Sequence, residues 1–245
     1  LGAHNEGKKQ WIKLLKKNHG SSDKVAEIWG FKKKSAYKVT WENLLRNHNW
    51  FNPKLKKKAK NDMVSFMKMI ATKWYQLHYQ TIKKYDQNHL ILADKNMIDS
   101  YNSWLIDPLK NYVDVIVIQS YNLFSKDTKM TDWLYKKTGK PIFNGDGSFA
   151  FIRKEQRKLK VKGWWTGSKN IKDVAFKYKL SLNNMMKKNY MIGWHHCGIL
   201  EQWDTAERGD VSSNENGFMD PYENFHTDLT LSLIHISEPT RRRTI

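Results

Sequence analysis

The sequence predicts an α/β fold, because short apolar runs alternate along the chain with segments of helical character. Four of these runs have the length of a strand and are bounded by polar or turn residues. Apolar runs without a polar face are typical of a parallel sheet that is buried on both sides. The predicted strands cover residues 89–93, 113–118, 141–143 and 190–194.

The residues that follow the predicted strands favour a (β/α)8 TIM barrel over an open wound sheet. In a barrel the functional side chains gather at the carboxyl ends of the strands. Each run here leads into polar or aromatic residues, as in Gln119-Ser120-Tyr121-Asn122 after the second run. The sequence contains neither GxGxxG nor GxxxxGK(S/T), so the usual signs of an open nucleotide-binding sheet are missing.

Helical segments separate the strands and precede them. Residues 8–17 and 22–31 have helical character, with Ser22 or Asp23 as the expected N-cap of the second segment. Another helix follows Pro53, where an apolar stripe has helical spacing and is expected to pack in the core. The stripe consists of Met63, Phe66, Met67, Ile70, Trp74, Leu77 and Thr81, and later helices are expected at residues 97–112, 130–138 and 171–188.

The composition is that of a folded protein with a basic surface. The chain is 40% hydrophobic, and no apolar run approaches the ~20 residues of a membrane span. The net charge is +19, but all except seven of the 43 basic residues are Lys, and they are scattered. Readers of phosphates and bases favour Arg, and no recognition motif is present. We therefore expect a solvated basic surface, with attraction to an anionic partner as the second option, and no nucleic-acid or membrane partner.

The sequence gives no sign of a metal site. Its one cysteine, Cys197, excludes an intramolecular disulfide framework and any multi-cysteine metal site. His195 and His196 are adjacent, and neighbouring residues of a strand point to opposite faces, so they are not expected to share a zinc ion. Cys197 is expected to be a buried free thiol rather than a nucleophile.

The C-terminal residues have a different character from the rest of the chain. The stretch LSLIHISEPTR, from Leu231 to Arg241, resembles the translation of a sequencing adapter. We therefore expect a catalytic-type domain over residues 1–230 and a non-native tail over residues 231–245.

Several segments, taken in order, resemble the retaining (β/α)8 glycoside hydrolases of the β-galactosidase and β-agarase type. Asn5-Glu6 resembles the acid/base signature that closes a strand in these enzymes, with residues 1–4 as the end of that strand. The later segments include the agarase-like features of glycoside hydrolase family 50, and the similarity covers nearly all of residues 1–230. These segments are residues 85–92 (YDQNHLIL), 113–118 (VDVIVI), 138–142 (TGKPI), 193–198 (GWHHCG) and 217–221 (GFMDP).

This resemblance implies roles for two carboxylates. Glu6 would be the general acid/base, and Asn5 would hydrogen-bond the sugar 2-OH. The family has a nucleophilic Glu at the end of the seventh strand, where this sequence has the shorter Asp146. Three options follow: Asp146 is still the nucleophile, the enzyme inverts, or another acid such as Glu201 attacks. We favour Asp146.

Other candidate residues have weaker support. Trp194 would stack on a sugar ring, His195 and His196 would bind hydroxyls, and Tyr121 would contact the nucleophile. The alternative for each is an ordinary packed side chain. Asp94 and Lys95 are expected to pair with each other, and Trp164, Trp165, Trp203 and Asp204 are candidates for sugar-binding walls.

The function that this resemblance implies is a glycoside hydrolase that cleaves O-glycosidic bonds of a polysaccharide or oligosaccharide, with an agar-type galactan as the favoured substrate. No metal or organic cofactor is expected. The alternative is a non-catalytic carbohydrate-binding relative. The polysaccharide could be an anionic glycan. A polysaccharide substrate implies a secreted or periplasmic protein.

The resemblance also predicts an incomplete barrel. If Glu6 ends the fourth strand, the chain holds only about strands four to eight. Five strands cannot close a barrel, so an open sheet edge, exposed apolar surface, poor solubility and little activity are expected for the chain alone.

Overall fold

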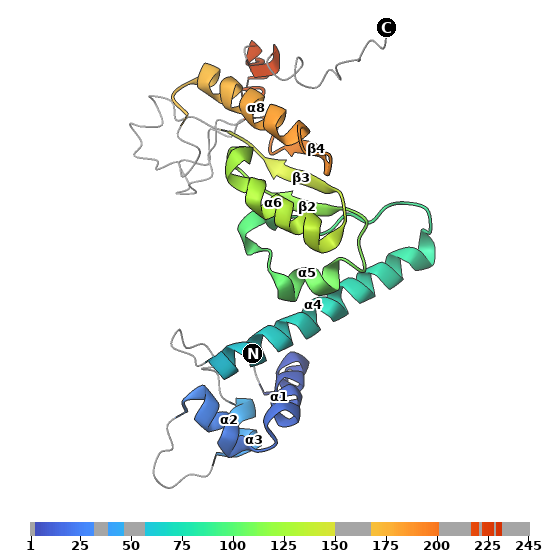
Figure 1. Cartoon of the computed structure of the whole chain (residues 1–245), viewed down its shortest axis with the longest axis vertical. Helices are drawn as coiled ribbons and strands as arrows, with labels where there is room; N and C mark the ends of the chain where they lie inside the picture. The colour runs from blue at the N-terminus through green and yellow to red at the C-terminus, as the bar shows by residue number, and fades with distance from the viewer. Residues whose placement is uncertain are drawn as a thin grey trace. The chain divides into compact units, whose positions relative to one another are not determined.

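The computed structural model describes residues 3–31, 39–46, 57–149, 168–200, 217–220, 222–227 and 229–231. The chain divides into two compact units. The helical unit comprises Leu1–Tyr85 and Ser103–Asn111, and the sheet unit comprises Asp86–Asn102 and Tyr112–Ile245. Figure 1 labels their elements.

The described part of the helical unit contains α1 (Glu6–His19), α2 (Ser22–Trp29), α3 (Trp41–Arg46), α4 (Lys57–Tyr85) and α5 (Ser103–Leu109). The two N-terminal helices lie where the sequence predicts them. The N-cap of α2 is Ser21 rather than Ser22 or Asp23, because the Ser21 hydroxyl accepts a hydrogen bond from the backbone N–H of Lys24. Trp11, Leu15, Val25 and Trp29 belong to the core that joins these helices.

The start of α1 corrects the prediction for Asn5-Glu6. Ala3 and His4 form a turn, Asn5 is the N-cap, and Glu6 is the first residue of the helix. The backbone N–H groups of Lys8 and Lys9 donate to the Asn5 carbonyl, so helical hydrogen bonding already begins there. Asn5-Glu6 therefore opens a helix directly, and residues 1 and 2 lie outside the described part.

Helix α4 confirms the predicted helix but not the predicted burial of its stripe. Ile70, Trp74 and Leu77 are 45%, 51% and 53% exposed. The buried residues of α4 lie on another face and include Ala71 and Tyr75. Periodicity identifies an apolar face but not its partner: α4 packs against α5 and the N-terminal helices through other residues, and of the stripe only Met63 and Phe66 reach the core.

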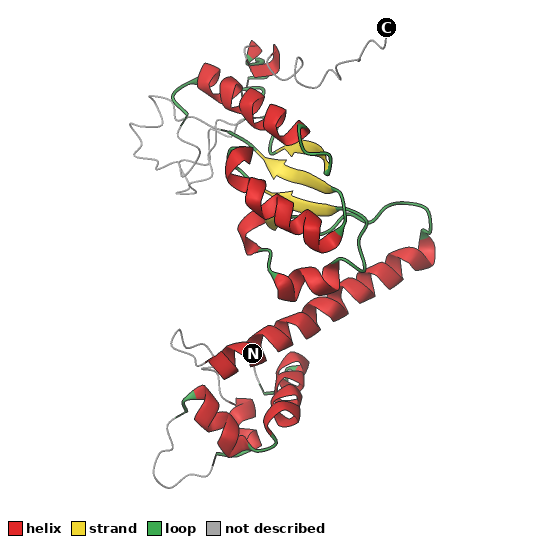
Figure 2. Cartoon of the chain, in the orientation of Figure 1, coloured by secondary structure: helices red, strands yellow, loops and turns green. Residues whose placement is uncertain are grey.

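The sheet unit is built on four parallel strands in the order β1-β2-β3-β4. They are β1 (Asn96–Met97), β2 (Ile116–Gln119), β3 (Ile142–Gly147) and β4 (Met191–His196), drawn as arrows in Figure 2. The second, third and fourth predicted strands are confirmed. The first run, residues 89–93, contributes one isolated bridge from Leu92 to Val115, and regular pairing begins only at Asn96.

Helices α6 (Phe124–Thr138) and α8 (Ile171–Met186) contact each other and cover one face of the sheet (Figures 1 and 2). The single helix expected over residues 97–112 is instead a 3-10 turn, η1 (Ile98–Ser100), followed by α5 in the other unit. Tyr101 between them is extended, and its hydroxyl donates to the carbonyl of Val117. This tertiary contact interrupts the helix.

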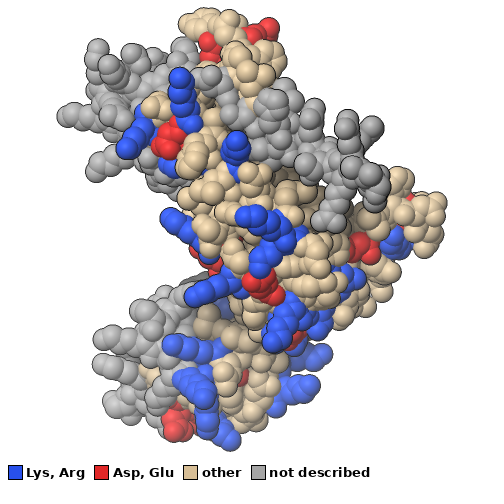
Figure 3. Space-filling model, turned by 45° about the horizontal axis from the view of Figure 1, so that its top comes forward, with Lys and Arg blue, Asp and Glu red and all other residues tan. Residues whose placement is uncertain are grey.

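No helix among the described residues is both long enough and apolar enough to span a membrane. Lys and Arg side chains are spread over the face shown in Figure 3, with acidic side chains among them.

Candidate functional site

Asp146 lies in β3, near the carboxyl end of the strand, and is only 5% exposed. Its backbone carbonyl accepts a hydrogen bond from the N–H of Ser120, which follows β2. Asp146 is paired in register with Gln119, the last residue of β2. The position of this carboxylate is therefore fixed by the pairing of two central strands.

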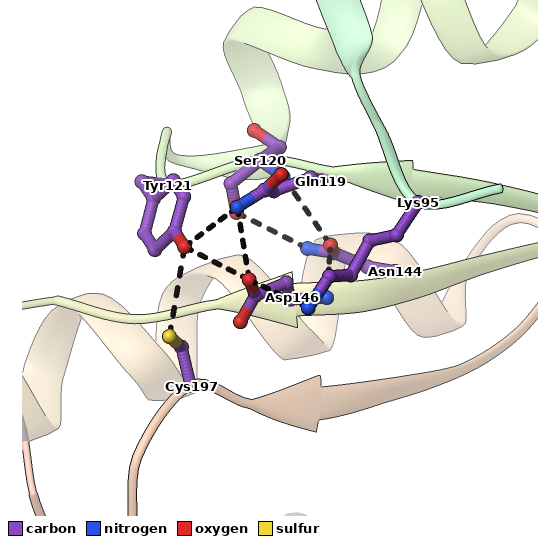
Figure 4. A network of polar contacts seen from close by, with 7 residues as sticks. All are labelled: Lys95, Gln119, Ser120, Tyr121, Asn144, Asp146 and Cys197. Atoms are coloured by element: carbon purple, nitrogen blue, oxygen red, sulfur yellow. Dashed lines mark hydrogen bonds and ion pairs between the residues drawn. The ribbon is translucent and has the colours of Figure 1, made fainter.

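Three donors converge on one oxygen of this carboxylate, as Figure 4 shows. Gln119 Nε2 lies 2.9 Å from Asp146 Oδ2, and the Tyr121 hydroxyl lies 3.0 Å from the same atom. Lys95 Nζ, from the segment before β1, lies 3.0 Å from it. Carboxyl ends of parallel strands meet at one edge of a sheet, which explains why residues far apart in the sequence meet here.

The surroundings of Asp146 favour its ionised form. Burial opposes ionisation, but hydrogen bonds from Cys197, Lys95 and Tyr121, together with the charge of Lys95, lower the pKa of Asp146 below its ordinary value. Burial also raises the pKa of Tyr121 well above that of a free tyrosine. Tyr121 therefore remains a proton-bearing donor beside a carboxylate.

Cys197 lies at the same site, directly after β4. The Tyr121 hydroxyl oxygen lies 3.6 Å from its sulfur, and the Cys197 side chain is half-buried and forms no disulfide. Burial and the neighbouring Asp146 raise the pKa of Cys197, so it remains a thiol. Cys197 was expected to be buried and is instead half-buried, and its lack of a nucleophilic role stays a prediction.

A second layer of hydrogen bonds supports the strand ends. The Asn144 side chain accepts from the Ser120 N–H and donates to the Ser120 carbonyl, both at 3.3 Å. The Ser120 hydroxyl donates to Asp127 Oδ2 at 2.5 Å, and Asp127 stands in α6. These contacts join β2, β3 and α6 behind Asp146.

The glycines on each side of Asp146 are required by space. A Cβ on Gly145 would lie 2.5 Å from Val117 Cγ1, and one on Gly147 would lie 2.6 Å from the Ser120 carbonyl oxygen. The sequence Asn-Gly-Asp-Gly is thus a signal for close strand packing around the carboxylate.

The structure brings Tyr121 to Asp146, as the sequence predicts. Lys95 forms its ion pair with Asp146 rather than with Asp94, because β1 carries it to the strand edge beside β2 and β3. The roles of Gln119 and Lys95 at Asp146 were missed by sequence reasoning. The signal that could have identified Gln119 and Lys95 is that both are polar residues at or next to the end of a predicted strand.

Trp194 and His196 pack against α8. The ring of Trp194 meets Tyr178 edge-on with centroids 5.2 Å apart, and His196 Nδ1 is 2.8 Å from the Tyr178 hydroxyl. His196 is buried whereas His195 is exposed, as expected for neighbours in a strand. The described residues contain no group of side chains suited to hold a metal ion. Substrate binding by these three residues stays a prediction.

Glu6 belongs to the helical unit, and its side chain is 70% exposed. A hydrogen bond from Gln10 and the charge of Lys9 lower its pKa. A general acid needs a raised pKa, so its predicted role requires surroundings other than those described for α1. Asn5 is a half-buried N-cap without a side-chain capping bond. The candidates Trp164, Trp165, Glu201, Trp203 and Asp204 lie outside the described residues.

The chain is similar in fold to known structures. Its sequence matches no protein-family model and no curated protein. The structure of PfGH50B aligns with 96% of this chain at 18% identity and a TM-score of 0.72, over 32% of its own length. An exo-β-agarase aligns with 94% at 16% identity and a TM-score of 0.74, over 29% of its length. The agarase AgWH50C aligns with 96% at 15% identity and a TM-score of 0.70, over 32% of its length.

The chain thus spans less than a third of the length of these proteins. At this level of identity, the similarity shows the fold. The chain has a glycoside hydrolase-like α/β fold, and its parallel sheet with helices fits part of a TIM-barrel-like architecture.

Proposed function

We propose that this chain is part of the catalytic domain of a glycoside hydrolase that cleaves O-glycosidic bonds of a polysaccharide or oligosaccharide. The observation that carries the proposal is Asp146: a buried carboxylate with a lowered pKa at the carboxyl ends of parallel strands. Barrel enzymes hold their catalytic groups at this edge. The fold similarity to two agarases supports an agar-type galactan as the substrate.

In the proposed reaction, Asp146 acts as the nucleophile and Glu6 as the general acid/base. A carboxylate oxygen of Asp146 bonds to the anomeric carbon while the bond from that carbon to the leaving oxygen breaks. The leaving oxygen keeps the electron pair and takes a proton from Glu6. In the second step ionised Glu6 takes a proton from water, the water oxygen bonds to the anomeric carbon, and the bond from that carbon to Asp146 breaks, which frees the carboxylate. Asn5 would bind the sugar 2-OH.

The stereochemistry follows from the separation of the carboxyl groups, about 5–5.5 Å in retaining and 6.5–9.5 Å in inverting enzymes. In an inverting enzyme Asp146 would instead take a proton from the attacking water. A third option is Glu201 as the nucleophile. The anomeric configuration of the first product, read by proton NMR, separates retention from inversion.

We further propose that residues 1–230 are the C-terminal portion of an eight-stranded barrel, about strands four to eight. The proposal is supported by the share of the aligned structures that the chain covers. It is also supported by exposed apolar side chains near both outer strands: Leu90 and Leu92 are 68% and 52% exposed, and Ile192 in β4 is 56% exposed. Unpaired edges with apolar flanks are typical of surfaces that another segment covers.

Two further proposals concern the tail and the setting of the protein. Residues 231–245 would be an adapter-derived tail, in line with a core that includes Leu229, which is 1% exposed, while Leu231 is 51% exposed. A polysaccharide substrate suggests a secreted or periplasmic protein, and the basic surface suits an anionic glycan.

The test is hydrolysis of agar-derived oligosaccharides by the protein that carries this chain. Asp146→Asn and Glu6→Gln should each lower kcat/KM by about 10³-fold or more, because each removes a reacting group. Asp132→Asn is the matched control, since Asp132 pairs with Lys188 away from the strand ends. Unchanged hydrolysis in Asp146→Asn contradicts the assignment. If the parent protein binds oligosaccharides but does not hydrolyse them, the alternative of a non-catalytic carbohydrate-binding relative is favoured. The specific reason for this alternative is that Asp146 stands where the family has a nucleophilic Glu.

A further inference from the structure

We infer that Lys95 is a positioning residue of the proposed reaction: its ammonium group holds Oδ2 of Asp146 and leaves Oδ1 as the oxygen that reacts. The inference rests on the proposed function and adds a residue to it. It starts from the unequal treatment of the two carboxylate oxygens.

All three strong donors described around Asp146 contact Oδ2. They are Gln119 Nε2 at 2.9 Å, the Tyr121 hydroxyl at 3.0 Å and Lys95 Nζ at 3.0 Å (Figure 4). The fourth group bonded to the carboxylate is the Cys197 thiol, which is a weak donor. The three strong donors occupy the lone pairs of Oδ2, so Oδ1 is the oxygen that keeps lone pairs available for a reacting group.

Lys95 differs from the other two donors in charge and in exposure. Gln119 and Tyr121 are neutral donors, whereas Lys95 is a cation. The Lys95 side chain is 47% exposed, while that of Asp146 is 7% exposed. The nearly buried carboxylate of Asp146 is therefore paired with a cation whose side chain reaches solvent. Removal of this cation leaves the carboxylate with neutral donors alone.

The aliphatic stem of Lys95 lies close to β3. A Cβ placed on Gly145 would lie 3.6 Å and 3.7 Å from Cδ and Cγ of Lys95, so the Lys95 stem passes over the glycine next to Asp146. The ion pair is thus accompanied by proximity of the Lys95 stem to the backbone of β3.

This arrangement serves either mechanism. A nucleophile must carry its charge to attack carbon, and a general base must carry it to accept a proton from water. Burial raises the pKa of Asp146, and the hydrogen bond and the charge of Lys95 are two of the causes that lower it, so removal of Lys95 should shift this pKa upward.

The first test measures this titration directly and needs no hydrolysis. The carboxyl ¹³C resonance of Asp146 is followed against pH in the full chain with labelled Asp, and Asp146→Asn assigns it. We expect a higher pKa of Asp146 in Lys95→Met and in Lys95→Gln, and a pKa near the parent value in Lys95→Arg. Lys188→Met is the matched control, because it breaks another ion pair of the sheet unit, 2.8 Å long, to Asp132. An unchanged Asp146 titration in both neutral variants overturns the inference.

The second test follows kcat/KM against pH in the active protein. Lys95→Met should move the acid limb to higher pH, with a loss of about tenfold on that limb and a smaller loss above neutral pH. Lys95→Arg should restore the parent profile. A loss of the same size at every pH would contradict the inference, since a merely structural role would not move the limb.

The two tests separate the inference from the function on which it rests. If the titration shifts in the neutral variants but the parent protein hydrolyses no glycan, Lys95 governs Asp146 and the proposed function fails. If hydrolysis is present and depends on Asp146 while the titration does not shift, the proposed function stands and the role of Lys95 is wrong.

Discussion

Each unit of this protein buries an aspartate among several donors, and the two sites differ in how those donors are arranged. Asp62 in α4 is 3% exposed. Its Oδ1 accepts from Asn18 Nδ2 at 3.0 Å, and its Oδ2 lies 2.8 Å from His19 Nε2 and 3.2 Å from Trp29 Nε1. Both oxygens of Asp62 are thus engaged, by residues on or beside α1 and α2.

Asp146 has a different arrangement, with its strong donors on one oxygen and its cation half-exposed. Asp62, engaged at both oxygens by side chains of α1 and α2, ties α4 to these two helices. A carboxylate held at one oxygen is fixed in place and still has an oxygen to react. The comparison teaches that two aspartates of similar burial differ in how their partners are distributed over the two oxygens, and the arrangement at Asp146 is the one that suits the proposed reaction.

The largest expected effect on stability belongs to Asp62. Asp62→Ala should lower the free energy of unfolding of the helical unit by about 3 kcal/mol, because it leaves the buried Trp29 Nε1 and the part-buried donors of His19 and Asn18 without their acceptor. Urea unfolding followed by tryptophan fluorescence measures it, since Trp29 is one of the donors. Glu27→Ala, at an exposed position of α2, should change the free energy by no more than about 0.5 kcal/mol. If the two substitutions lowered the free energy of unfolding equally, Asp62 would have no special structural role.

A smaller effect is expected from the glycines, which sharpen the comparison of the units. Gly147→Ala should destabilise the sheet unit by about 2 kcal/mol, because its Cβ would meet the backbone oxygen of Ser120 at 2.6 Å. Gly30→Ala should cost about 1 kcal/mol through its φ of 69° alone, since nothing lies within 4 Å of its Cβ. Thermal unfolding of both variants measures the difference. If Gly147→Ala were the milder change, close packing would not be what holds the strand around Asp146.

The smallest expected effect is on the pH dependence of stability. The pKa of Asp146 is lowered in the folded chain, so its ionisation stabilises the fold above the ordinary Asp pKa, and this stability is lost as pH falls through the lowered value. The pKa of Asp127 is raised, by burial above all, so its contribution has the opposite sign: stability falls as pH rises from the ordinary value through the raised one.

Urea unfolding at several pH values between about 2 and 6 tests both signs. Asp146→Asn should flatten the acid side of the stability profile, and Asp127→Asn should remove the opposing slope at higher pH. Equal slopes in the parent chain and Asp146→Asn would mean that the partners of Asp146 do not favour its ionised form.

Much of the fold could be predicted because local patterns carry it. The apolar runs identified β2, β3 and β4, and helical spacing identified α4. The contact between Tyr121 and Asp146 was also predicted, and the structure confirms it at 3.0 Å. That prediction rested on a resemblance, which carries information about strand order that composition and periodicity lack.

Other features could not be predicted for physical reasons. The stripe of α4 has ideal helical spacing, yet Trp74 and Leu77 are exposed, because spacing describes one helix and burial depends on a partner. Lys95 sits next to Asp94 in the sequence, which suggested a pair between them. The side chains of adjacent residues diverge in extended chain, and strand pairing brought Lys95 to Asp146 instead.

The sequence by itself determined the alternation of strands and helices, the polar strand ends and the glycines around Asp146, because these depend on periodicity and on the size of side chains. Only the tertiary structure decided which polar groups share the site. Lys95, Gln119 and Asp146 lie tens of residues apart, and the parallel register of β1, β2 and β3 brings Lys95 Nζ to 3.0 Å and Gln119 Nε2 to 2.9 Å from Asp146 Oδ2. Register is set by packing across the whole sheet, so no local pattern could select one cation for this carboxylate.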